Sequence, residues 1–309
     1  MRSDLVPVQG PTDADPAGVD SLNGVGPRSA VWATARGELR LDRPRLMGIL
    51  NVTPDSFFDG GLYRDPEAAL AQAHRLLEEG ADLIDVGGES TRPGARRVSL
   101  AEERSRVVPV VRALARAWPD LLLSVDTTRS EVAAAALDEG AAVVNDVSAL
   151  RLDPGLAATC ATRGAGLVLM HSRGDVDRMA SYETAKYGED PVSEIVDELE
   201  RALAAARAAG VPDSALVVDP GLGFSKRTEH SVAVLRQLPR LGRLGRPMLI
   251  GPSRKRFVGE LSGGLPVEDR LPGTIAACVA GLLAGARLFR VHDVGAVRRA
   301  LEVAEAVAP

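Results

Sequence analysis

Short apolar runs recur eight times along this chain, and each ends at a polar residue or a tight polar turn. The runs are 47–50, 83–84, 121–125, 142–144, 167–170, 216–218, 248–250 and 288–291. The residues that follow or end them are Asn51, Asp85, Asp126, Asn145, His171, Asp219, Gly251 and His292. A helix-like stretch follows every run. This alternation predicts an α/β fold, a (β/α)8 TIM barrel whose active-site face is formed by the carboxyl ends of the strands.

The chain length favours a single barrel with a short extension. It has 309 residues, and one barrel takes about 250. Residues 1–28 carry Pro, Gly, Asp and Ser without apolar periodicity, so we expect a disordered N-terminal tail. Two alternating runs, 31–34 and 38–41, flank a turn at 35–37 and predict a β-hairpin that plugs the bottom of the barrel. We therefore predict one domain over residues 29–309, a TIM barrel with an N-terminal β-hairpin extension.

Composition narrows the possible functions. The net charge is -5, which gives no indication of a nucleic acid or a membrane as partner. Cys160 and Cys278 stand far apart in Ala-rich stretches, so we expect buried free thiols and no zinc site. The chain has no apolar run of about 18 residues and no apolar signal-peptide core near its start. We therefore expect a cytoplasmic enzyme.

Three short polar side chains, Asp126, Asn145 and Asp219, end strands with apolar interiors. Such residues often serve only as helix caps. A capping-box pattern at 128–131 already supplies a cap after Asp126, which leaves Asp126 free to point into the barrel mouth. Two carboxylates and an amide on one rim suit a ligand with a donor-rich edge, such as a 2-amino-pyrimidinone ring.

The last two strands carry cationic residues. Residues 253–256 read Ser-Arg-Lys-Arg, and Arg290 and His292 are two positions apart, on the same side of an extended strand. Barrels commonly bind phosphate in this region. A charged Arg in an apolar strand needs an anionic partner, which is either a ligand or a carboxylate of the protein itself.

Two polar loops follow the first two strands. Residues 51–57 contain a Pro and several hydrogen-bonding side chains, and residues 85–94 contain three Gly and Arg92. Each indicates either a loop over a binding site or an ordinary turn. The sequence shows no Ser/His/Asp nucleophilic set and no His-rich metal site. The remaining pattern favours a site for a polar heterocycle that carries a phosphate group.

Seven segments in order resemble the dihydropteroate synthases, pterin-binding TIM-barrel enzymes of folate biosynthesis, over about residues 31–309. The segments are MGILNVTPDSFFDGG from Met47, DVGGESTRPGA from Asp85, SVDTTR from Ser124, NDVS from Asn145, VVDPGLGFSK from Val217, SRKRFVG from Ser253 and FRVHDV from Phe289. The resemblance implies a transferase that joins 7,8-dihydropterin-6-ylmethyl diphosphate to 4-aminobenzoate and releases pyrophosphate. It also implies a sulfonamide target and a homodimer formed through barrel helices.

The resemblance assigns roles to particular residues. The pterin is held by Asp126, Asn145, Asp219 and Lys255. The magnesium ion bound to the diphosphate is ligated by Asn51, and the diphosphate contacts Thr91, Arg290 and His292. The aminobenzoate is bordered by Ser253, Pro93 and Phe224. The first two loops, around Asp55 and Arg92, close over the site, and the catalytic residues are Asp126, Lys255, Arg92 and Asp55.

The chain departs from the family pattern in three places. Ala149 and Leu150 follow NDVS where the family usually has two glycines, Ser172 stands where a second Met is common, and Pro252 replaces a small or β-branched residue. A pterin-dependent methyltransferase is one alternative, although it does not need the STRPG, SRK and RVH segments. A non-catalytic pterin-binding paralogue is the other, and the changed loop after Ser148 keeps it open.

Overall fold

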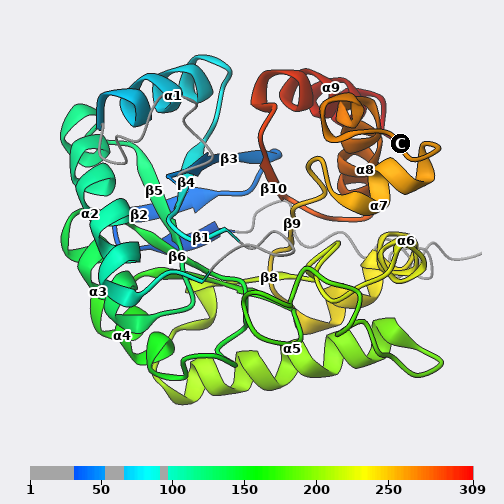
Figure 1. Cartoon of the computed structure of the whole chain (residues 1–309), viewed down its shortest axis with the longest axis horizontal. Helices are drawn as coiled ribbons and strands as arrows, with labels where there is room; N and C mark the ends of the chain where they lie inside the picture. Colours follow the sequence, from blue (N-terminus) through cyan, green and yellow to red (C-terminus); the bar gives the residue numbers. More distant parts are fainter. Residues whose placement is uncertain (1–30, 53–65, 91–96, 309) are drawn as a thin grey trace, which may run out of the picture.

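The computed structural model describes residues 31–52, 66–90 and 97–308. Eight parallel strands form its centre: β3 (Arg45–Asn51), β4 (Leu83–Gly87), β5 (Leu122–Asp126), β6 (Val143–Asp146), β7 (Gly166–Met170), β8 (Leu216–Asp219), β9 (Leu249–Ile250) and β10 (Leu288–Val291). Their spatial order is β8-β7-β6-β5-β4-β3-β10-β9. A parallel bridge between Val218 and Met248 joins the two edges, so the strands close into the predicted barrel (Figure 1).

Helices cover the outside of this barrel (Figure 1). In the described part of the chain they are α1 (Pro66–Glu78), α2 (Leu100–Ala117), α3 (Ser130–Asp138), α4 (Gly155–Arg163), α5 (Pro191–Ala208), α6 (Thr228–Arg236), α7 (Arg256–Leu261), α8 (Leu271–Leu283) and α9 (Val294–Val307). Apolar faces of these helices pack on the outward side chains of the strands and form the largest core cluster. None of the helices within the described ranges is long and apolar enough to cross a membrane.

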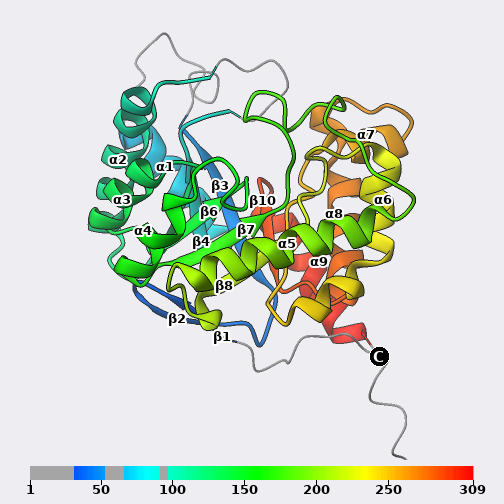
Figure 2. The ribbon, with the colours of Figure 1, turned by 90° about the horizontal axis from the view of Figure 1, so that it is seen from below.

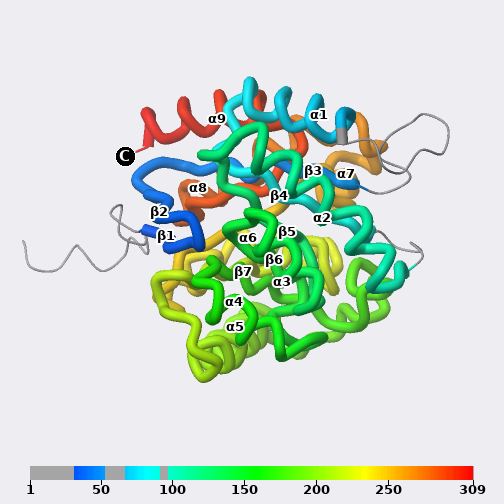
Figure 3. Tube along the Cα trace, turned by 90° about the vertical axis from the view of Figure 1, so that its left-hand side faces the viewer, coloured from blue at the N-terminus to red at the C-terminus, as the bar shows by residue number. Residues whose placement is uncertain are grey.

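A two-stranded hairpin precedes the barrel, as the sequence predicts. Strands β1 (Val31–Thr34) and β2 (Gly37–Arg40) pair antiparallel. Trp32 is fully buried, its indole N–H donates to the carbonyl of Ala215, and it belongs to one apolar cluster with inward residues of the strands, among them Met47, Val168 and Leu288. The hairpin therefore plugs one end of the barrel, on the side where the chain also ends (Figures 2 and 3).

Two helices begin with different kinds of cap. Ser99 caps α2 by accepting from the backbone N–H of Glu102. The capping box expected at 128–131 is wrong, because α3 begins at Ser130 and the backbone N–H of Ser130 donates to the carboxylate of Asp153. A carboxylate from the next βα loop therefore replaces the local cap.

The loop after β6 has an unusual backbone. Ala149 and Leu150 have φ of 50° and 66°, the left-handed region that costs a residue with a Cβ roughly 1–2 kcal/mol. Asp146 stabilises this turn by accepting from the backbone N–H of Ser148 and of Leu150. Glycine would adopt this conformation without steric cost.

We expect Ala149→Gly to raise the free energy of unfolding by about 0.5 kcal/mol, because glycine adopts this φ without steric cost. Urea unfolding measures the change. Ala158→Gly, at an exposed position within α4, is the matched control, and it should lower the free energy by about 1 kcal/mol. Equal destabilisation by both variants would contradict the strain argument.

Candidate active site

Arg290 is the centre of the charged cluster inside the barrel. Its Nε lies 2.6 Å from the Asp85 carboxylate, and a terminal nitrogen lies 2.7 Å from the Asp126 carboxylate. The sequence left open whether the anionic partner of Arg290 is a ligand or a carboxylate of the protein. The structure shows two carboxylates of the protein in contact with it. Against the effect of burial, those two carboxylates hold the pKa of Arg290 above its usual value.

Asp85 is a site residue that sequence reasoning missed. The sequence placed it at the end of a strand, but β4 continues to Gly87, so Asp85 points into the barrel and is fully buried. Its Oδ2 also accepts from the amide of Asn145 at 2.9 Å. Asp85 thus orients both Arg290 and Asn145 beneath the rim.

Two amide side chains lie beside these carboxylates. The Oδ1 of Asn145 is buried and has no hydrogen-bond partner among the described residues, so it is an acceptor directed at a donor from elsewhere. Asn51 ends β3 next to Gly87, where an added Cβ would come within 3.6 Å of both the Asn51 Oδ1 and the Asp126 Oδ2. The Asn51 and Asp126 side chains therefore lie on either side of Gly87.

Asp219 ends β8 and starts a tight turn. Its Oδ1 accepts from the backbone N–H of Gly221 at 2.6 Å. Gly221 has φ of 68°, and a Cβ there would lie 2.0 Å from the carbonyl oxygen of His171, so only glycine fits. The turn holds the buried Asp219 carboxylate at the barrel mouth.

Lys255 is held over an aromatic ring. Its ammonium lies 3.5 Å from the centre of the Phe224 ring, a cation–π contact. Burial and the Arg290 charge lower the pKa of Lys255 to about 7, while Asp219 and Asp126 act to raise it. Lys255 and Phe224, which the sequence assigned to adjoining parts of the site, are therefore in contact.

Burial also raises the pKa values of two carboxyl groups at the barrel mouth. It raises the pKa of Asp126 to about 7, against the Arg290 charge and with added repulsion from Asp85 and Glu103. It raises the pKa of Asp219 to about 6, against the Gly221 N–H and the nearby lysines. The mouth therefore combines acids and a lysine whose charges change near neutral pH, which is typical of functional sites.

Ser253 and His292 form a separate pair at the ends of β9 and β10. The Ser253 hydroxyl lies 2.9 Å from His292 Nδ1 and accepts from the His292 backbone N–H. Burial, with the charges of Arg290 and Arg254, lowers the pKa of His292 to about 3. His292 is therefore neutral at neutral pH and adds no charge to the cationic patch expected on these strands.

Four predicted residues, Asp55, Thr91, Arg92 and Pro93, lie outside the described residues. The others cluster at one end of the barrel. Sequence reasoning also missed Lys226, which is almost fully buried and bonded to His171. The signal for Lys226 was present in the segment 217–226, which contains Asp219 and ends at Lys226.

Comparison with known proteins shows which family the chain belongs to. The family model for pterin-binding enzymes matches residues 47–292. The dihydropteroate synthase of Synechocystis sp. is 43% identical over 265 residues, covering 86% of this chain and 90% of that protein. The chain therefore belongs to the pterin-binding enzymes and, within them, to the dihydropteroate synthases, which are transferases of folate synthesis.

Solved structures show the same fold. The Xanthomonas albilineans dihydropteroate synthase, solved with 4-aminobenzoic acid, is 48% identical with a TM-score of 0.81 and covers 87% of this chain and 95% of its own. The same protein has been solved with 7,8-dihydropteroate. The Yersinia pestis dihydropteroate synthase, solved as a sulfonamide drug complex, is 40% identical with a TM-score of 0.82, covering 89% of this chain and 98% of its own.

Proposed function

We propose that this chain joins 7,8-dihydropterin-6-ylmethyl diphosphate to 4-aminobenzoate at the barrel mouth, releasing pyrophosphate. The observation that carries the proposal is a set of acceptors on one rim: the buried Asp219 carboxylate, the buried and unpartnered Oδ1 of Asn145, and the Asp126 carboxylate, which is 15% exposed. A pterin edge offers donors that match them. Family membership supports the same reaction.

The pterin and the diphosphate take opposite parts of the mouth. Asp219, Asn145 and Asp126 accept hydrogen bonds from the pterin ring, and Lys255 donates to it. Arg290 lies between the two parts, because it bonds to Asp126, and with His292 it faces the diphosphate. The neutral His292 acts here as a hydrogen-bond donor rather than a charge.

Phe224 and Ser253 border the aminobenzoate in this assignment, together with Pro93. Phe224 is nearly buried and offers an apolar ring edge, while the Lys255 cation covers its face. The resemblance assigns Asp55, Thr91 and Arg92, which lie outside the described residues, to the same site. The same pocket is the proposed sulfonamide target.

The residues present fit a magnesium ion that arrives with its substrate. The described residues contain no group of three or more His, Cys, Asp or Glu side chains that holds a metal. Asn51 nevertheless offers an amide oxygen at the end of β3, beside Gly87, which pairs with Asp126 on its other side, and Mg²⁺ is often bound by one or two protein oxygens plus substrate phosphates. Asn51 would hold the ion, which supplies charge neutralisation to the leaving diphosphate.

The chain's own residues then position the reaction. The bond between the pterin methylene and the diphosphate breaks as the electron-rich ring, oriented by Asp126 and Asp219, stabilises the developing positive charge. The aniline nitrogen attacks that methylene and loses a proton, so no protein nucleophile is required. Holding both substrates in place contributes on the order of 7 kcal/mol at best.

The test is pyrophosphate release by the purified chain with Mg²⁺, the pterin diphosphate and 4-aminobenzoate. We expect release that depends on both substrates and is lost when the metal is chelated. Pterin binding without release would instead support the non-catalytic paralogue. Pyrophosphate release in the absence of 4-aminobenzoate would contradict the proposed reaction.

We also propose a homodimer and a cytoplasmic location. Support for the dimer is the exposure of large apolar side chains toward the C-terminal part of the barrel: Leu261, Val267, Leu283, Val303 and Val307. Such residues covered by a second copy would form an apolar interface. Light scattering after gel filtration should give twice the mass of the chain, and a monomer would contradict it.

A further inference from the structure

Lys226 is a buried cation that the proposed reaction does not use. Its side chain is 1% exposed, and its ammonium lies 2.8 Å from His171 Nδ1 and 3.0 Å from the carbonyl oxygen of Phe224. No ion pair joins it to a carboxylate among the described residues. A buried ammonium held by neutral acceptors is costly, so a specific arrangement must maintain it.

His171 connects Lys226 to the outside of the barrel. Its Nδ1 faces Lys226 and its Nε2 lies 3.0 Å from the carboxylate of Glu198. Because the Glu198 carboxylate only accepts, the proton of the neutral ring is on Nε2, and Nδ1 accepts from Lys226. Burial and the Lys226 charge lower the pKa of His171 to about 4, which agrees with this neutral ring.

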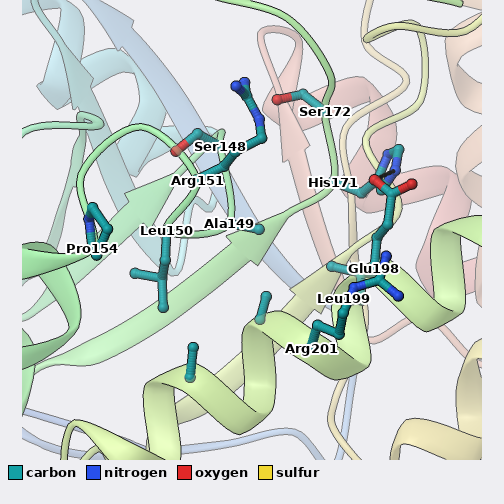
Figure 4. Close-up of a pocket in the computed structure, with 12 residues that line it drawn as sticks. Ser148, Ala149, Leu150, Arg151, Pro154, His171, Ser172, Glu198, Leu199 and Arg201 are labelled. Carbon is teal, nitrogen blue, oxygen red and sulfur yellow. Dashed lines mark hydrogen bonds and ion pairs between the residues drawn. The ribbon is translucent and has the colours of Figure 1, made fainter.

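Glu198 reaches this position from α5. The residue before His171, Met170, packs inside the barrel, so the imidazole turns outward to meet the helix, as Figure 4 shows for His171 and Glu198. Both residues line a cavity of about 470 Å³ between α5 and the loop after β6. Glu198, 29% exposed, thus joins the outer layer of the fold to a cation behind the mouth.

Lys226 lies behind Asp219 through His171. Its ammonium contacts the ring and the carbonyl oxygen of His171, and the backbone N–H of His171 donates to the carbonyl of Asp219 at 2.9 Å. Burial raises the pKa of Asp219 to about 6, and Lys226, Lys255 and Arg290 oppose that rise. Burial lowers the pKa of Lys226 to about 7; Asp219 and Glu198 act to raise it, while Arg173 and Lys255 lower it. Because Lys226 and Asp219 each favour the charged form of the other, a change at Glu198 is transmitted to the mouth.

We propose that Glu198 and His171 are positioning residues that hold Lys226 behind Asp219, so that Asp219 binds the pterin as a carboxylate. This inference rests on the proposed role of Asp219 in pterin binding. It gives a function to the hydrogen-bonded chain of Glu198, His171 and Lys226, which lies outside the proposed contacts with either substrate.

The first test is Glu198→Gln against a matched control. Glu194 lies one turn earlier on α5 and contacts the same Arg173, but it has no contact with His171. Removing the charge of Glu198 should lower the pKa of Lys226 and raise that of Asp219. We expect Glu198→Gln to raise the KM for the pterin diphosphate about tenfold near pH 7, with kcat within about twofold, and Glu194→Gln to leave both unchanged.

The pH dependence of pterin affinity provides a second measurement. A purely structural role of Glu198 would not shift it. Ionised Asp219 binds pterin, so affinity falls as the pH drops through the pKa of Asp219. In Glu198→Gln this fall should begin at higher pH than in the unchanged protein and in Glu194→Gln. An unshifted profile would overturn the inference.

The second test separates the two nitrogens of His171. His171→Asn keeps an oxygen near the place of Nδ1 and can still accept from Lys226, whereas His171→Ala keeps no acceptor. We expect pterin affinity to be partly retained in the Asn variant and lost about tenfold in the Ala variant. Equal losses in both variants would contradict the Lys226 contact as the cause.

The outcomes distinguish this inference from the proposed function. If Asp219→Asn leaves pterin binding unchanged, the role of Asp219 is wrong and the inference falls with it. If Asp219→Asn weakens binding while Glu198→Gln behaves like Glu194→Gln, only the Glu198–His171–Lys226 inference is overturned.

Discussion

Asp219→Asn should raise the dissociation constant of the pterin substrate about 100-fold, a loss of roughly 2.7 kcal/mol. The change keeps the size of the side chain but removes a buried charge and replaces one acceptor oxygen with a donor. Hydrogen bonds to a charged group contribute about 1.5–3 kcal/mol each, so losing one or two gives this magnitude. Calorimetric titration with the pterin diphosphate measures it.

Asp146→Asn is the matched control. Asp146 is also a buried acid at a strand end, but its oxygens accept from Ser148 and Leu150 in its own loop. We expect this variant to lower stability and leave pterin affinity within about threefold, because local hydrogen bonds contribute mainly to folding. Equal losses of affinity would mean that Asp219 acts through the fold and not through contact with pterin.

Asp219 also determines how pterin affinity depends on pH on the acid side. Its folded pKa, about 6, is above the usual value near 3.8, so ionised Asp219 costs stability at neutral pH and the protein gains nothing from it without ligand. Pterin affinity should fall as the pH drops below about 6 and Asp219 gains a proton. In Asp219→Asn this dependence should be flattened.

Arg290→Ala should lower the free energy of unfolding by about 3–5 kcal/mol, because it leaves the buried carboxylates of Asp85 and Asp126 without their partner. Turnover should be lost as well, since Asp126 is no longer held. Urea unfolding and pyrophosphate release measure the two effects. Arg290→Lys keeps a charge but cannot bridge both carboxylates, so its loss should be smaller.

Two further variants test whether the lost ion pairs cause the destabilisation expected for Arg290→Ala. Arg240→Ala removes an Arg whose partner Asp190 is largely exposed, and it should cost less than about 1 kcal/mol. The double variant Asp85→Asn with Arg290→Ala should recover part of the lost stability, because one uncompensated charge is removed. No recovery would show that packing of the Arg290 side chain, and not charge, causes the loss.

Much of the fold could be predicted because apolar runs and polar strand ends are local patterns. The ends of β3, β5 and β8 fall at Asn51, Asp126 and Asp219, as predicted. The hairpin was visible for the same reason. The error at β4 arose because the apolar run breaks at Asp85, where the strand continues into the barrel with a buried charge.

The contacts within the site could not be predicted in this way. Arg290 and Asp85 are 205 residues apart in the sequence, and nothing local indicates which carboxylate a buried Arg will meet. The same holds for Lys226 and His171, and for the replacement of the α3 cap by Asp153. Each partner is chosen by the closure of the barrel, which brings distant strand ends together.

The sequence by itself determined the alternation of strands and helices, the family, and the identity of the acids, amides and cations at the barrel mouth. Periodicity and strand-end polarity are properties of neighbouring residues, so they are readable from the chain. Only the tertiary structure decided that Arg290 is paired within the protein, that His292 is neutral and that Glu198 reaches Lys226 through His171. Burial and charge pairing set these states, and both depend on groups that meet only when the barrel closes.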